Sequence, residues 1–186
     1  SSSSAASDVY KRQNLVGEGD SFFENQDGQY FVDRAAERKL SASASKTFTR
    51  FGVGMADFDN DGHLDMYQAN GRVGDARARV EAKPHSLTDP FAEPNVLFRG
   101  LSDASFEEVL PRGGTAQEIV ATSRAAVFGD IDNDGGVDLL LVKRDAPANL
   151  LRNRVSDRGN WAGFRVLEAS GRDALGAVLR LKLGDR

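Results

Sequence analysis

One acidic pattern of nine residues occurs twice in this chain of 186 residues, and it constrains the fold more than any other feature. The copies are 57–65 (DFDNDGHLD) and 130–138 (DIDNDGGVD), each with Asp at positions 1, 3, 5 and 9 and Gly at position 6. Short runs of apolar and small residues precede and follow each copy, which is typical of strands. The repeated unit is therefore predicted to be strand, acidic loop, strand.

The spacing of the aspartates predicts a metal site in each loop. Calcium takes six to eight oxygen ligands at ~2.3–2.6 Å, and alternate residues of a tightly wound loop can direct carboxylates to one centre. Glycine at position 6 allows the sharp turn, and a backbone carbonyl at position 7 would add a ligand. We expect two Ca²⁺ sites, with His63 and Gly136 acting through their backbone carbonyls; the predicted ligands are Asp57, Asp59, Asp61, His63 and Asp65, and Asp130, Asp132, Asp134, Gly136 and Asp138.

Three other interpretations compete with a calcium site in each loop. An EF-hand needs Glu at position 12 and helices on both sides, whereas position 12 is Gln68 in one loop and Leu141 in the other. Magnesium takes fewer protein ligands than the loops offer. A plain Asx-turn without metal is the remaining alternative. Because clustered carboxylates repel one another, the loops are expected to be disordered or partly protonated without a cation.

Hairpin patterns separate the two acidic loops. Residues 95–109 indicate a hairpin with a polar turn, residues 21–32 indicate an earlier copy, and a third begins at residue 149. Four strands per period are typical of a β-propeller blade. The period is longer than a blade requires, and the polar, proline-containing segment 72–94 is predicted to be an insertion. The fold class expected is all-β, with partial four-stranded propeller blades that carry the acidic loop between their first two strands.

The two ends of the chain differ from the middle. Residues 1–7 are of low complexity, and residues 8–13 resemble the translated end of a sequencing adapter, so 1–13 is predicted to be a non-native or disordered tail. The blades are assigned to 14–154. Residues 159–167 and 175–183 have strand-like patterns. Residues 155–186 are therefore expected to begin a separate, small β-rich module.

These residues carry a resemblance to a known family. The two loops resemble the calcium loops of FG-GAP or VCBS repeats, and the hairpin pieces 97–99 and 106–109 are similar to outer strands of such blades in bacterial relatives of cartilage acidic protein. Residues 160–177 resemble the start of an ASPIC/UnbV domain. The Gly-Ala-Pro element that follows the loop in this family is absent here. The resemblance implies a calcium-binding, usually exported β-propeller protein.

Composition narrows the function classes. Lys plus Arg number 24 and Asp plus Glu number 28, so the net charge of −4 argues against a nucleic-acid partner. There is no Cys, which excludes disulfides and thiolate chemistry. No apolar run approaches the ~20 residues of a membrane span. Only His63 and His85 are present, and no nucleophile-elbow, Walker A or zincin pattern occurs, so no enzyme is expected.

The function expected is that of a non-catalytic, calcium-binding adhesion or scaffold module whose ligand is an unknown protein or carbohydrate. The alternative is a propeller enzyme or a biosynthetic accessory protein with catalytic residues outside this sequence. Weak calcium modules work near ~10⁻⁴–10⁻³ M, which favours an extracellular, cell-surface or periplasmic location. We expect a signal peptide to precede the sequence given.

Overall fold

The computed structural model describes residues 9–12, 19–40, 48–73 and 89–182, with the backbone alone for 9–12. In these ranges the chain forms strands joined by turns, with no α-helix and one 3₁₀ turn, η3 (Arg112–Gly114). The all-β prediction is confirmed. The strands are β1 (Val9–Arg12), β2 (Ser21–Gln26), β3 (Tyr30–Asp33), β4 (Arg50–Ala56), β5 (Asp65–Asn70), β6 (Glu93–Pro94), β7 (Val96–Gly100), β8 (Phe106–Glu108), β9 (Val120–Ala121), β10 (Ser123–Gly129), β11 (Asp138–Lys143) and β12 (Ala146–Leu151).

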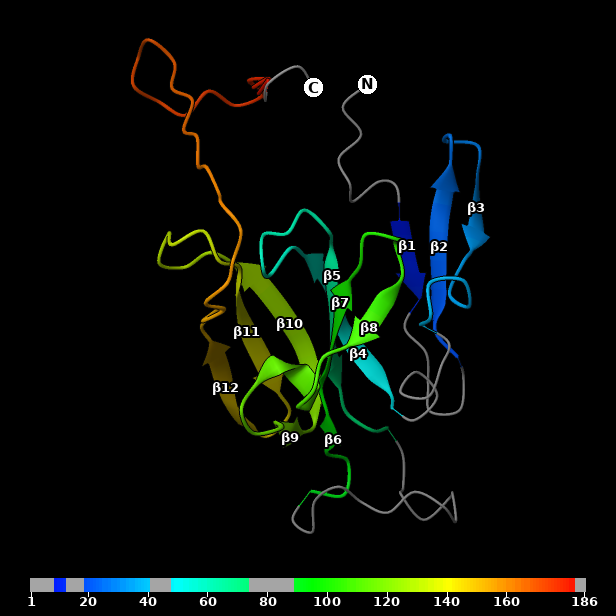
Figure 1. Cartoon of the computed structure of the whole chain (residues 1–186). Helices are drawn as coiled ribbons and strands as arrows, with labels where there is room; N and C mark the ends of the chain where they lie inside the picture. Colours follow the sequence, from blue (N-terminus) through cyan, green and yellow to red (C-terminus); the bar gives the residue numbers. More distant parts are fainter. Residues whose placement is uncertain (1–8, 13–18, 41–47, 74–88, 183–186) are drawn as a thin grey trace.

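Three antiparallel sheets lie side by side (Figure 1). The central sheet has the order β4-β5-β7-β8, with β1-β2-β3 on one side and β10-β11-β12 on the other; none of them closes on itself. A short pairing of β6 with β9 joins the segments that lead into β7 and β10. The predicted hairpins of residues 21–32 and 95–109 are present as β2-β3 and β7-β8.

The acidic loops occupy equivalent places in two of the sheets. Loop one, residues 57–64, connects β4 to β5, and loop two, residues 130–137, connects β10 to β11. Both loops lie at the same end of the molecule, opposite the end that carries β6 and β9 (Figure 1). The predicted unit of strand, acidic loop, strand is therefore present twice, in a four-stranded and in a three-stranded sheet.

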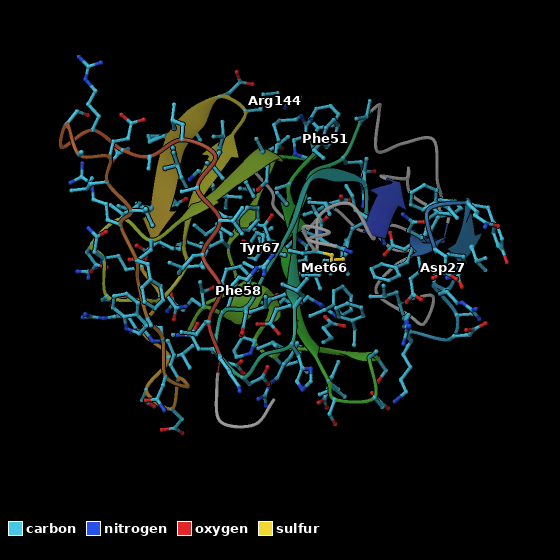
Figure 2. All side chains as sticks on the ribbon, turned by 90° about the horizontal axis from the view of Figure 1, so that it is seen from above. Asp27, Phe51, Phe58, Met66, Tyr67 and Arg144 are labelled. Atoms are coloured by element: carbon cyan, nitrogen blue, oxygen red, sulfur yellow. The ribbon has the colours of Figure 1, made fainter. Side chains whose placement is uncertain are left out.

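The molecule has two hydrophobic cores, and strand β5 contributes side chains to both because both of its faces are buried. All six of its residues are buried. Met66 packs with Phe22, Phe98 and others toward β1-β2-β3. Tyr67 packs with Leu139 and others toward β10-β11-β12. Figure 2 shows Met66 and Tyr67 on opposite sides of their strand. Alternation along one strand thus joins three sheets into one packed body.

Strands β4 and β10 approach closely. A Cβ built on Gly52 would lie 2.6 Å from the backbone nitrogen of Ala126 and 2.9 Å from the carbonyl carbon of Ala125. A side chain at position 52 would therefore force the two sheets apart. Glycine here is required by packing and not by a turn.

The ends of the sequence depart from the expectation in two places. Residues 9–12 of the predicted tail form β1, which pairs with β2, while 1–8 and 13 lie outside the described residues. Residues 155–182 contain no strand, only an isolated bridge between Leu167 and Asp173, although the alternation predicts strands there. Alternation marks a face that needs a partner to bury it, and Leu175 is 94% exposed. Of the predicted insertion 72–94, residues 74–88 lie outside the described part.

Candidate metal centres

The two acidic loops have the same local winding. In loop one, Asp57 accepts hydrogen bonds from the backbone N–H groups of Asp61 (3.1 Å) and Gly62 (2.9 Å). In loop two, Asp130 accepts them from Asp134 (3.1 Å) and Gly135 (2.8 Å). Both loops also turn through left-handed backbone at their fourth and sixth residues, with φ 55° and 91° in loop one and 57° and 82° in loop two. Asn tolerates this conformation at the fourth position and Gly at the sixth.

The ninth residue ties each loop to its sheet. Asp65 is 3% exposed and accepts hydrogen bonds from the N–H groups of Phe58 (2.9 Å) and Gly100 (2.8 Å). Asp138 is 2% exposed and accepts them from Ile131 (3.0 Å) and Asn153 (2.8 Å). Gly100 ends β7 and Asn153 lies two residues after β12, so each bond joins the loop to the end of the third strand of its sheet.

The structure gathers three carboxylates in each loop. One oxygen from each carboxylate lies within 4.8 Å of the others in two triads, Asp57, Asp59 and Asp61, and Asp130, Asp132 and Asp138. Oxygens on opposite sides of a Ca²⁺ ion are ~4.6–5.2 Å apart, since each lies ~2.3–2.6 Å from the ion. Each triad is therefore compatible with one shared cation. Of the predicted carboxylate ligands, Asp65 and Asp134 lie outside the triads.

The fifth aspartate of each loop has an arginine partner, but it belongs to the triad in loop one only. In loop two, Arg158 binds Asp134 at 3.0 Å, and this guanidinium holds the pKa of Asp134 below its usual value. In loop one, Asp61 stays in the triad; burial works against its ionisation, but the His63 N–H and the Arg99 guanidinium still hold its pKa below the usual value. The seventh residues, His63 and Gly136, donate their N–H groups to the fifth aspartate, at 2.9 and 2.8 Å. Their role as carbonyl ligands stays a prediction.

The pKa of Asp65, in contrast, lies above its usual value. Burial raises it to about 6, the charges of Asp59 and Asp61 add to the effect, and the hydrogen bonds from Gly100 and Phe58 oppose it. Burial therefore contributes more to this shift than the neighbouring carboxylates do. Backbone N–H groups and arginines lie against the aspartates of both loops and offset part of their mutual repulsion.

Sequence reasoning missed the basic partners of the loops. Arg99, the fourth residue of β7, lies 2.9 Å from both Asp59 and Asp61. Arg152, just after β12, forms an ion pair with Asp132. The signal was available, because both arginines end a similar stretch, 95–99 (NVLFR) and 149–152 (NLLR). Only the pairing of strands brings them to the loops.

The two loops are also joined to each other. The side-chain amide of Asn60 donates to the Gly135 carbonyl at 3.1 Å, and the amide of Asn153 donates to the Phe58 carbonyl at 2.7 Å. The N–H of Gly159 reaches the Asp59 carbonyl at 2.8 Å. One hydrogen bond therefore links the loops directly, and two more link loop one to the segment that follows β12.

A cavity of about 300 Å³ opens beside the loops, between the central sheet and β10-β11-β12. Its apolar walls come from both sheets and include Phe58, Tyr67, Leu97, Leu139 and Leu151. Figure 2 shows Phe58 and Tyr67 near each other in this region. Burial raises the pKa of Tyr67, so its hydroxyl stays protonated.

Neither the protein-family models nor the curated proteins contain a match to this chain. The described residues hold no helix that is both long and apolar enough to cross a membrane.

Proposed function

We propose that this chain is a calcium-binding, non-catalytic repeat protein that carries one Ca²⁺ ion in each acidic loop. The observation that carries the proposal is the repeated geometry: two loops far apart in sequence share one winding, and each brings three carboxylate oxygens within 4.8 Å. Hard carboxylate oxygens in this number suit calcium, and the turn at the sixth residue suits a loop that wraps around an ion. The proposed ligands are all those predicted for the two loops, including Asp65, Asp134 and the backbone carbonyls of His63 and Gly136.

The sheets that carry the loops are, in this proposal, blades of the FG-GAP or VCBS type. Three features support it: the four-stranded central sheet, the position of each acidic loop between the first two strands, and the close packing of first strand on first strand between neighbouring sheets. The resemblance of residues 160–177 to an ASPIC/UnbV domain remains part of the proposal. So does an extracellular, cell-surface or periplasmic location, where calcium is abundant enough for weak sites.

The role proposed for calcium is to stiffen the end of the molecule at which the two loops meet. Loops on a rigid scaffold are the usual carriers of recognition, so this end is proposed to bind a protein or carbohydrate partner in an adhesion or scaffold role. The apolar cavity beside the loops adds a recessed surface to that end.

The test is calorimetric titration of Ca²⁺ into the chain, with melting curves in calcium and in chelator. We expect two sites with Kd on the order of 10⁻⁴–10⁻³ M and a higher Tm in calcium. Asp57→Asn and Asp130→Asn should each remove one site, while Asp27→Asn, in the exposed turn between β2 and β3, should leave both. A folded wild-type chain that binds no calcium would refute the proposal.

A further inference from the structure

Arg99 contacts two of the three carboxylates that form the triad of loop one. Its terminal nitrogen Nη2 lies 2.9 Å from Oδ2 of Asp59 and 2.9 Å from Oδ2 of Asp61. Both aspartates belong to the triad of loop one. A single positively charged nitrogen thus bridges two of the three carboxylates that calcium would need.

Arg152 approaches the second triad from the equivalent position and contacts one of its carboxylates, that of Asp132. The two arginines are structurally equivalent. Arg99 precedes Gly100, whose N–H binds Asp65, and Arg152 precedes Asn153, whose N–H binds Asp138. The same backbone anchor therefore delivers a guanidinium to each triad from the third strand of each sheet.

These contacts compete with a bound ion. A guanidinium nitrogen 2.9 Å from two triad oxygens repels a cation held by the same carboxylates, and it occupies part of the lone-pair capacity that calcium would use at ~2.3–2.6 Å. Arginine does not deprotonate in proteins, so the guanidinium does not leave by losing its charge. It leaves only if its side chain swings out, and Arg99 and Arg152 are both about half exposed, with room to do so.

We propose that Arg99 and Arg152 are built-in competitors of calcium: each guanidinium neutralises its acidic triad when calcium is scarce, and calcium binds by displacing it. This inference rests on the proposed function. The arginines then have two roles. They stabilise the wound loops at low calcium, and they lower the calcium affinity of the sites at high calcium. The affinity of each site is then set by a residue that is not a ligand.

The first experiment compares Arg152→Gln with Arg154→Gln by calcium titration. Both variants lose one positive charge near loop two, since the charge of Arg154 also acts on Asp134, but only Arg152 contacts the triad. We expect Arg152→Gln to tighten one of the two sites roughly three- to fivefold, the size expected for losing a half-exposed ion pair. Arg154→Gln should change it less than twofold. Arg99→Gln should tighten the other site.

Melting curves separate competition from a purely structural role. In chelator, Arg99→Gln and Arg152→Gln should melt below wild type, because the aspartates then repel one another without compensation. In saturating calcium, both should melt at or above wild type. A structural arginine would lower the Tm in both conditions, and that result, or an unchanged or weakened affinity, would overturn the inference.

A measurement on the wild-type chain does not depend on the variants folding. The Nη–H₂ signals of Arg99 and Arg152, whose Nη2 atoms make the contacts, should exchange faster with solvent in ¹⁵N spectra as calcium is added. The Nε–H signal of Arg165, which is paired with Asp173 in the C-terminal segment, should not change. Unchanged arginine signals at saturating calcium would overturn the inference and leave the calcium sites standing. A wild-type chain without calcium binding would instead refute the proposed function.

Discussion

Identical residues in the acidic loops have different chemistry. The first and ninth aspartates both bind backbone N–H groups, but Asp57 lies at the half-buried start of loop one, whereas Asp65 lies under it at 3% exposure. Burial raises the pKa of Asp65 to about 6, and the charges of Asp59 and Asp61 add to this rise.

Asp65 predicts a pH dependence of stability in chelator. Its pKa is about 6 in the folded chain and about 3.8 when unfolded, so the stability it contributes is fully present below pH ~4 and is lost as pH rises through ~6. The loss is up to about 3 kcal/mol. The measurement is urea unfolding of wild type and of Asp65→Asn with chelator present. We expect the difference between their free energies of unfolding, wild type minus variant, to fall between pH 4 and pH 7.

Two comparisons make the pH prediction specific. Asp27→Asn should keep the wild-type pH profile, because Asp27 is exposed in a turn. In saturating calcium the wild-type dependence should reverse, since calcium binds the ionised loop and acid then weakens its contribution. An Asp65→Asn variant with the full wild-type slope in chelator would rule out Asp65 as the source.

The strands and hairpins can be predicted from the local sequence pattern, but the packing of the sheets against one another cannot. Alternation and turn residues predict the hairpins β2-β3 and β7-β8 and the strands on both sides of each acidic loop. They do not indicate that β4 and β10 meet with backbone against backbone at Gly52. This contact sets the distance between two sheets and hence the distance between the two loops.

Gly52→Ala is expected to destabilise the chain by about 1–3 kcal/mol, because the added Cβ meets the backbone of Ala125 and Ala126, which cannot rotate away. Gly129→Ala is the matched control, as Gly129 lies in β10 with open space around it. Its effect should stay within about 0.5 kcal/mol. Equal effects of the two substitutions in urea unfolding would contradict the packing argument.

At the scale of the whole molecule, buried charges hold together the end opposite the acidic loops. The side chains of Arg50 and Asp20 are fully buried and pair at 2.9 Å. Glu93, also fully buried, binds Arg72 at 3.2 Å and the Thr49 N–H at 2.8 Å. These contacts connect the segment before β2, the start of β4, the end of β5 and strand β6. One network therefore fixes four separate segments.

Glu93→Gln is expected to cost about 3–5 kcal/mol, because it leaves the buried guanidinium of Arg72 without its counter-charge. Glu107→Gln, at an exposed position of β8, should change stability by less than about 0.5 kcal/mol. Chemical denaturation followed by circular dichroism measures both. A Glu93→Gln variant as stable as Glu107→Gln would show that the buried pair contributes nothing net.

The sequence by itself determined the features that depend on near neighbours. The winding of each loop, the strands beside it and the hairpins use hydrogen bonds and turn preferences among residues a few positions apart, so spacing alone reveals them. The alternating pattern within residues 159–182 wrongly predicts strands there, because an alternating segment forms a strand only where another strand pairs with it.

Only the tertiary structure decided which groups meet the acidic loops. Arg99 lies 38 residues from Asp61, and Asn153 lies 95 residues from the Phe58 carbonyl that it binds. Strand pairing and sheet packing bring these groups together. The fifth aspartates, Asp61 and Asp134, thereby meet different arginines, and burial raises the pKa of Asp65. Desolvation and distance are properties of the folded chain, and no spacing of residues contains them.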